Sequence, residues 1–285
     1  MIEVHALNKR VNHFELCIDH LSIKPGITLV VGQNGAGKST LLHVLATVLE
    51  PDQGRIIYAN VPDCPLPLLR AEIGFLPTGI ELHQDMTVHR LLLYLAELKG
   101  QRPAAAKAEV EELIELFQLN SARNYKIKSL SQGTQQRIAI AQSLIGWPHF
   151  LFLDEPLTYL DSMEKRRVIS VLNRNYSRKR AAVVVSHDLE EWEGCCDHVL
   201  WMDKGRVRFY GSPEQWKCPT VRRIWEGKIK ANELEQFPPT DVIRCKPSGD
   251  GHFSIRVIAS QRPSPSFQPV EPSLEEAYFI RNRSL

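Results

Sequence analysis

A glycine-rich loop between residues 32 and 40 has the clearest chemical pattern in this chain, because it ends in a lysine followed by two hydroxyl residues. Its spacing, G-x-x-x-x-G-K-[ST], is that of a phosphate-binding P-loop. Backbone N–H groups of such a loop turn towards an anion, and the helix that follows adds the positive end of its dipole. The residues predicted to bind a nucleotide here are Gly32, Asn34, Gly35, Ala36, Gly37, Lys38, Ser39 and Thr40.

The segments on both sides of this loop agree with the motif. The apolar run Ile27 to Val31 predicts a strand before it, and residues 38–49 predict a helix after it. In this setting we expect Lys38 to reach the β- and γ-phosphates and the Ser39 hydroxyl to hold Mg²⁺. The alternative, a glycine-rich turn beside a solvated lysine, is disfavoured because the motif and its context occur together.

Two adjacent carboxylates follow a second apolar run. Residues 150–153 predict a buried strand, and Asp154 and Glu155 come directly after it. Asp154 is predicted to hold the same Mg²⁺ as Ser39, and Glu155 to orient a water for attack on the γ-phosphate. A buried strand that ends in an acidic helix cap is the plainer alternative.

Three further polar positions are candidates for the same chemistry. Ser131 and Gly133 precede a predicted helix, 135–145, whose N-terminus offers an anion site, although Ser131 is equally typical of an ordinary N-cap. His187 follows a predicted central strand, Ala181 to Val185, from which an imidazole can reach the γ-phosphate; a structural histidine is the alternative. Asp161, taken alone, indicates a helix cap.

The elements that must position these residues alternate between strands and helices, which predicts an α/β fold with a mostly parallel sheet. Two strands before the P-loop, 2–7 and 14–23, are expected to form an antiparallel N-terminal part. A mainly helical stretch, about 79–148, interrupts the pattern as an inserted subdomain and contains a predicted helix at 103–119. Residues 216–285 are expected to form a small α+β extension, with a hairpin at 242–258 and a helix at 274–280.

Composition excludes some classes of function. The 285 residues carry a net charge of +2, so we expect no nucleic-acid partner. No stretch of 18 apolar residues and no signal peptide is evident, so any membrane-spanning part is expected in another subunit. The six cysteines, among them Cys64, lack C-x-x-C spacing and are predicted to be reduced thiols.

Taken in order, these motifs resemble the ATP-binding cassette (ABC) ATPases over about residues 1–215, which we predict to form a P-loop nucleotide-binding domain. The resemblance implies ATP and Mg²⁺ as cofactors, and a second nucleotide-binding subunit, identical or different, paired head to tail. Ser131 and Gly133 of one subunit then close on the nucleotide of the other, and Asp161 matches an aspartate that acts across the interface. It also implies integral membrane permease subunits docked on the helical subdomain, and a peripheral location on the cytoplasmic face of the membrane.

The chain departs from the family pattern at a few positions. Gln132 and Thr134 replace a glycine and a glutamine of the Leu-Ser-Gly-Gly-Gln signature. Thr78 replaces a glutamine that joins the metal and the attacking water to the helical subdomain, and it is expected to act through a bridging water. Val11 lies where an adenine-stacking tyrosine is common; the possible substitutes are His13 and Phe14.

The segment 272–279 resembles the endings of bacterial exporter ATPases and predicts an exporter. A C-terminal helix explains the same residues without any function. Two other functions remain open: a soluble cassette acting on a protein or nucleic-acid assembly, and a weakly hydrolysing regulatory cassette. A P-loop kinase is disfavoured because it does not need Ser131, Gly133 or His187.

Overall fold

The computed structural model describes residues 1–59, 61, 65–176, 179–218, 223–249 and 251–283. It divides into two compact units, Met1–Tyr210 and Gly211–Leu285, so the division falls at Tyr210 whereas the sequence placed it at 215. The cysteines in the described part form no disulfide, and Cys64 lies outside the described residues. No helix in the described part is long and apolar enough to cross a membrane.

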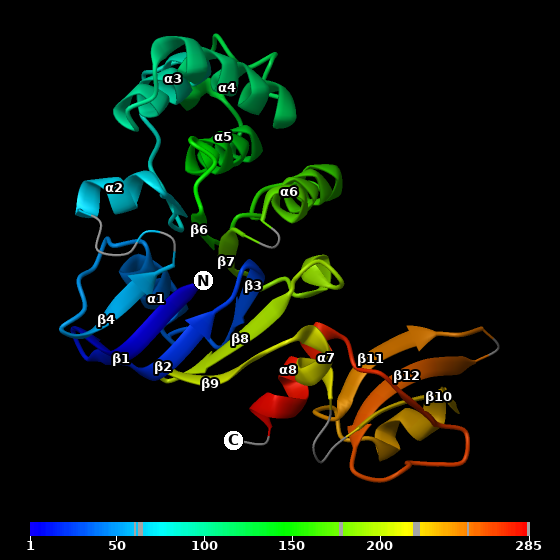
Figure 1. Cartoon of the computed structure of the whole chain (residues 1–285). Coiled ribbons are helices and arrows are strands. Elements are labelled where there is room, and N and C mark those ends of the chain that lie inside the picture. Colours follow the sequence, from blue (N-terminus) through cyan, green and yellow to red (C-terminus); the bar gives the residue numbers. More distant parts are fainter. Residues whose placement is uncertain (60, 62–64, 177–178, 219–222, 250, 284–285) are drawn as a thin grey trace. The chain divides into compact units, whose positions relative to one another are not determined.

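The first unit is built around two sheets (Figure 1). A three-stranded antiparallel sheet has the order β2-β1-β4, and a six-stranded sheet has the order β5-β6-β7-β3-β8-β9. Together with the helices they confirm the predicted α/β fold with an antiparallel N-terminal part. The strands are β1 (Ile2–Val11), β2 (Phe14–Ile23), β3 (Gly26–Val31), β4 (Gln53–Tyr58), β5 (Ile73–Leu76), β6 (Phe150–Asp154), β7 (Ala181–Val185), β8 (His198–Asp203) and β9 (Arg206–Gly211).

The centre of the larger sheet explains where the polar residues gather. Strands β6, β7 and β3 are neighbours, run parallel and are buried at every residue, as expected for short apolar strands covered on both faces. Parallel neighbours end at the same edge of a sheet. The residues that follow them, from Gly32, Glu155 and Ser186 onward, therefore emerge side by side.

Six α-helices are described in this unit, and some boundaries differ from the sequence prediction. Helix α1 ends at Leu45 rather than at 49, because Thr47 has φ 59° and Val48 N–H returns to His43 O. Helix α4 ends at Leu116 rather than at 119, since Gln118 has φ 52°. The helices are α1 (Lys38–Leu45), α2 (Leu66–Ala71), α3 (Val88–Leu98), α4 (Pro103–Leu116), α5 (Gln132–Leu144) and α6 (Ser162–Asn175).

The helical stretch between β5 and β6 has its own small core. Thr87 caps α3 by accepting a hydrogen bond from Arg90 N–H, and α3 and α4 lie side by side with α5 next to α3 (Figure 1). Apolar side chains at helical spacing are buried between them, which is the reason these amphipathic helices form. The buried residues are Val88, Leu91, Leu92, Ala96, Ala106, Val110, Leu113 and Ile114.

The second unit is a small antiparallel sheet of order β11-β12-β10-β13. The predicted hairpin is present as β11 (Val242–Pro247) and β12 (His252–Ala259), whereas β10 (Arg223–Lys230) and β13 (Gln268–Val270) were not predicted. Trp225, Ile255 and Phe267 are in its core. Helices α7 (Pro213–Lys217) and α8 (Leu274–Asn282) pack together through Trp216, whose ring nitrogen donates to Leu274 O.

Candidate functional site

The P-loop lies between β3 and α1. At two of its positions a neighbouring group lies so close to the backbone that only glycine fits. A Cβ on Gly32 would lie 2.4 Å from Met202 O, and one on Gly37 would lie 2.4 Å from the Phe14 ring. Gly37 also has φ 98° and is the N-cap of α1 without any side-chain cap. The first N–H groups of α1 therefore have no side-chain acceptor, which is the arrangement that binds an anion at a helix N-terminus.

Lys38 is bound to the loop that it follows. Its Nζ donates to Gly32 O at 2.7 Å and to Gln33 O at 2.9 Å, and the residue is only 7% exposed. Burial lowers the pKa of the ammonium group, and the nearby carboxylates of Glu155 and Asp154 oppose that shift. The loop thus holds a partly desolvated cation beside two carboxylates.

A cavity of about 690 Å³ brings most of the predicted nucleotide and metal residues together. Its wall comes from the P-loop, the ends of β6 and β7, the loop after β5 and the turn between β1 and β2. Gly32 and Ala36 are not part of the lining; Ala36 is buried and its carbonyl accepts a hydrogen bond from Gly205 N–H. The predicted residues that do line it are Asn34, Gly35, Gly37, Lys38, Ser39, Thr40, Thr78, Asp154, Glu155 and His187.

Glu155 and His187 form a pair at the adjacent ends of β6 and β7. Glu155 Oε1 lies 3.3 Å from His187 Nε2, and Oε2 accepts a hydrogen bond from His187 N–H at 3.4 Å. Burial raises the pKa of the Glu155 carboxyl, and the imidazole lowers it in part. Both side chains line the cavity, so a carboxylate and an imidazole face the same space as Lys38.

Gln136, which was not among the residues predicted from the sequence, positions the segment that carries Glu155. Its side-chain nitrogen donates to Pro156 O at 3.0 Å and to Glu155 O at 3.4 Å. Glu155 itself has φ 52°, a left-handed conformation that a non-glycine residue adopts only when its surroundings impose it. Gln136 lies on α5, one turn after Gln132. No local sequence pattern predicts that its side chain donates to the backbone carbonyls of Glu155 and Pro156.

The residues expected to hold Mg²⁺ have suitable chemistry. Asp154 is 3% exposed, and its Oδ2 is buried without a hydrogen-bond partner among the described residues. The side chains of Ser39 and Thr78 line the same cavity. Mg²⁺ prefers oxygen ligands from one or two carboxylates, hydroxyls and water, so this donor set fits the ion.

The two candidates for stacking on a base, His13 and Phe14, both line this cavity, as does Val11. They belong to the turn between β1 and β2. Only Phe14 is so close to the P-loop that a side chain on Gly37 would collide with its ring. Phe14 is therefore the aromatic residue best placed next to a bound nucleotide.

Ser131, Gly133 and Asp161 lie apart from this cavity lining. Ser131 Oγ accepts a hydrogen bond from Thr134 N–H at 3.2 Å and lies 2.9 Å from the Thr134 hydroxyl, so Ser131 is the N-cap of α5 and the helix starts at Gln132. Gly133 packs against Tyr159, where a Cβ would lie 2.8 Å from the carbonyl oxygen. Asp161 caps α6 in a reciprocal capping box with Glu164.

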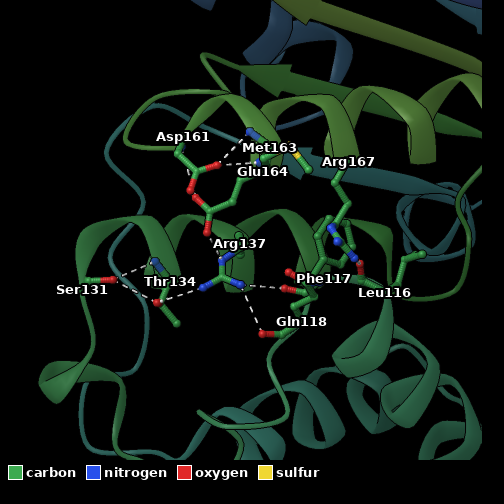
Figure 2. Close-up of polar contacts among 10 residues, drawn as sticks. All are labelled: Leu116, Phe117, Gln118, Ser131, Thr134, Arg137, Asp161, Met163, Glu164 and Arg167. Carbon is green, nitrogen blue, oxygen red and sulfur yellow. Dashed lines mark hydrogen bonds and ion pairs between the residues drawn. The ribbon is translucent and has the colours of Figure 1, made fainter.

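Arg137 joins these separate caps, as Figure 2 shows. Its guanidinium donates to the Thr134 hydroxyl and to Phe117 O and Gln118 O, and its Nε lies 3.0 Å from Glu164 Oε1. One side chain thus connects the start of α5, the start of α6 and the end of α4. No local sequence pattern indicates this role, because the partners are up to 27 positions away in the chain.

The chain is similar in sequence to members of a known protein family. The family model described as ABC transporter matches residues 19–158. The chain is 30% identical over 274 residues to the sulfate/thiosulfate import ATP-binding protein CysA of Pectobacterium atrosepticum, which covers 90% of this chain and 82% of that protein. With the protein of the same name from Synechocystis it shares 31% identity over 217 residues, 75% of this chain and 61% of the relative, so it spans about three fifths of that protein's length.

The fold is also similar to solved structures. A dimeric structure of the ATP-binding cassette MJ0796 bound to ADP and Pi superposes with a TM-score of 0.65 at 23% sequence identity. The match covers 74% of this chain and 98% of that one. At this identity the likeness establishes the fold of the matched region.

Proposed function

Because this chain belongs to the ABC transporter family of ATP-binding proteins, we propose that it is the ATP-hydrolysing subunit of a membrane transporter. One observation carries the proposal: Lys38, Asp154, Glu155 and His187 come from distant parts of the chain and line one cavity beside the P-loop. A nucleotide-binding protein that only senses ATP does not need a carboxylate at the end of the Asp154 strand, paired with an imidazole, facing the phosphate site.

Each residue of the cavity has a role in this proposal. The N–H groups of the P-loop and α1 bind the phosphates, and Lys38 exchanges its two backbone carbonyls for the β- and γ-phosphates. Ser39 and Asp154 would hold Mg²⁺, and Thr78 would act through a water. When bound, the ion neutralises charge that develops on the phosphate oxygens.

Glu155 acts on the attacking water and His187 on the γ-phosphate. The carboxylate accepts a hydrogen bond from the water and orients it in line with the bond that breaks. His187, 3.3 Å from that carboxylate, holds it in position and donates a hydrogen bond towards the phosphate. Gln136 fixes the backbone on which Glu155 stands.

The proposal includes a second nucleotide-binding subunit. Ser131, Gly133 and Asp161 lie apart from the cavity of their own chain, which supports the idea that they complete the site of a partner. ATP then closes the pair and hydrolysis reopens it. The partner is either a second copy or a different cassette.

The proposal also includes integral membrane permease subunits that dock on the helical segment, and with them a peripheral location on the cytoplasmic face of the membrane. Exposed apolar side chains on this segment support it: Leu98 is 64% exposed and Tyr125 is 60% exposed. The modest net charge of +2 favours a protein partner over a nucleic acid.

Segment 272–279, from which an exporter was predicted, does not establish the direction of transport. Segment 272–279 contains Ser273 and Glu276, which form the capping box of α8. This structural role explains why these residues occur here without any reference to transport. The relatives reported above are named for import. The exporter function therefore stays a prediction, and the proposal is a transport ATPase without an assigned direction.

Phosphate release by the purified full chain tests the proposal. Glu155→Gln should slow hydrolysis by about 100-fold or more, as expected when a group that acts on the reacting water is lost. ATP binding should stay within twofold, and the exposed Glu50→Gln should leave both unchanged. Equal hydrolysis by wild type and Glu155→Gln would remove Glu155 from the mechanism. Hydrolysis near background in the wild type, restored by Thr78→Gln, would favour the weakly hydrolysing regulatory cassette instead.

A further inference from the structure

A cluster of potential metal ligands lies on the three-stranded sheet, away from the nucleotide cavity. His5 on β1 is directly opposite His20 on β2, and their ring centroids are 5.2 Å apart. Glu3 precedes His5 by two residues, so both side chains emerge on the same face of β1. One ligand atom from each of Glu3, His5 and His20 lies within 4.8 Å of the other two, and none of the three residues lines the cavity beside the P-loop.

The carboxylate of this cluster is already oriented. Ser22, the cross-strand partner of Glu3, donates its hydroxyl hydrogen to Glu3 Oε1 at 2.7 Å. The other oxygen, Oε2, faces His20 Nε2 at 4.0 Å. A hydrogen bond that holds a carboxylate in this way is typical of the groups that surround a metal ligand.

We propose that Glu3, His5 and His20 bind a zinc ion. Two imidazoles and one carboxylate form a known ligand set for Zn²⁺ with water in the open position, and hard oxygen-seeking ions such as Mg²⁺ do not favour imidazole. Ligand distances of about 2.0–2.1 Å require the side chains to draw together. The His20 side chain is 63% exposed, and the backbone pairing of β1 with β2 holds His20 opposite His5.

The neighbouring charge explains why the carboxylate is needed. Arg55 on β4 is the cross-strand partner of His5 on the side opposite β2, so a cationic side chain starts from the position next to the cluster. The negative charge of Glu3 offsets that repulsion for an incoming metal. A site of two imidazoles without this carboxylate would bind Zn²⁺ less well.

Zinc at this position joins two strands that lead to the nucleotide cavity. The chain runs from His5 along β1 to the turn at Val11 and Phe14, which lines that cavity, and returns along β2 to His20. A ligand that binds only the folded hairpin stabilises it in proportion to the logarithm of its concentration. The metal is therefore expected to raise the melting temperature of the full chain.

Zinc titration of the full chain against a colorimetric chelator, under reducing conditions, tests this site. Wild type should bind one Zn²⁺ equivalent that His20→Gln and Glu3→Gln lose, and Ser22→Ala should bind about 10-fold more weakly. His149→Gln is the matched control, because His149 Nδ1 pairs with Glu72 Oε2 at 2.6 Å but belongs to no group of three ligands among the described residues. ATP binding by each variant checks that it is folded.

Cobalt substitution separates this site from the thiols of the chain. Co²⁺ bound by imidazole and carboxylate should show weak visible bands without the intense charge-transfer bands of a thiolate ligand. Equal zinc affinity in wild type and His20→Gln would overturn the proposal. Thiolate bands that persist in His20→Gln would overturn it too, and would assign the binding to cysteines.

Discussion

The nucleotide cavity and the region around the start of α5 carry the two groups of predicted site residues, and the structure holds them in different ways. In the cavity, Lys38 and Asp154 are buried within one chain, and they are close enough that the Asp154 carboxylate affects the pKa of Lys38. Around α5, Ser131 and Asp161 are exposed, and their side chains cap helices. The first group lines a cavity within its own chain, whereas the second is exposed on the surface, in keeping with the proposal that it completes the site of a partner.

The two regions are nevertheless joined through the chain. Gln136 on α5 holds the backbone of Glu155, and Arg137, the next residue, holds the caps of α5 and α6 (Figure 2). Adjacent side chains on one helix therefore point to the two regions. A displacement of α5 would therefore change the surroundings of both Glu155 and the residues that we propose to face a partner.

The largest effect is expected from a substitution in the nucleotide cavity that leaves the region around the start of α5 unchanged. Lys38→Met removes a charged donor to the phosphates, and charge-assisted hydrogen bonds contribute about 1.5–3 kcal/mol, so ATP should bind about 10- to 100-fold more weakly. Hydrolysis should fall to background. Fluorescent-nucleotide titration of the purified chain measures this, with the exposed Lys107→Met as control. Unchanged affinity in Lys38→Met would contradict the role given to the cavity.

The next effect tests whether the second region acts on a partner. Ser131→Ala should leave ATP binding by the single chain within twofold, because Ser131 does not line its own cavity. Hydrolysis should fall by about 10-fold or more, since a donor that helps to stabilise the transition state is lost. The variant also loses an N-cap, so its unfolding curve is recorded alongside.

Mixing the Lys38→Met and Ser131→Ala variants makes this test more specific. A pair made of one Lys38→Met chain and one Ser131→Ala chain contains one site with an intact Lys38 and an intact Ser131 from opposite chains. If the residues act across the interface, the mixture should hydrolyse ATP faster than either variant alone. No recovery, in a mixture shown to form mixed pairs, would place Ser131 in the site of its own chain or in a merely structural role.

A smaller effect, on the stability of the fold, is expected when Arg137 no longer connects the N-terminal caps of α5 and α6. Arg137→Met leaves Glu164 without its guanidinium partner, and both side chains are largely buried, at 15% and 21% exposure. The free energy of unfolding should fall by about 1–3 kcal/mol. Urea unfolding measures it, with Arg167→Met as control because Arg167 makes one long hydrogen bond, 3.4 Å, to Leu116 O. Equal losses in both variants would argue against a special role for Arg137.

The smallest expected effect is a shift in the pH dependence of kcat, and it involves residues of the cavity only. Burial raises the pKa of Glu155, so its neutral form persists to higher pH than that of an exposed glutamate. Only the carboxylate form can take a proton from the attacking water, so kcat should rise with pH through this raised pKa. The His187 imidazole lowers that pKa, and His187→Gln should therefore move the rise to higher pH. Initial rates at saturating MgATP across about pH 5–9 test the shift, and an unchanged midpoint would contradict it.

Local patterns predicted the parts of the site that a few consecutive residues encode. The loop at 32–40 and the strand before Asp154 depend on glycine freedom and apolar burial, which act over a few positions, and side-chain capping at Ser131 was recognised as the alternative to an anion site. The end of α1 was missed because Thr47 takes a left-handed conformation that threonine rarely adopts. Strands β10 and β13 were missed because each is stabilised by pairing with distant residues.

The sequence by itself determined the chemistry available to this protein: a P-loop, a strand that ends in two carboxylates, and a histidine after another strand. Tertiary structure decided which of these meet. The order β6-β7-β3 brings Glu155, His187 and Lys38 to one edge of a sheet, and Arg137 and Gln136 find partners that no local rule identifies. The reason is physical, since the conformation of a loop or cap depends on its own residues, while the meeting of distant side chains depends on how buried strands and helices pack.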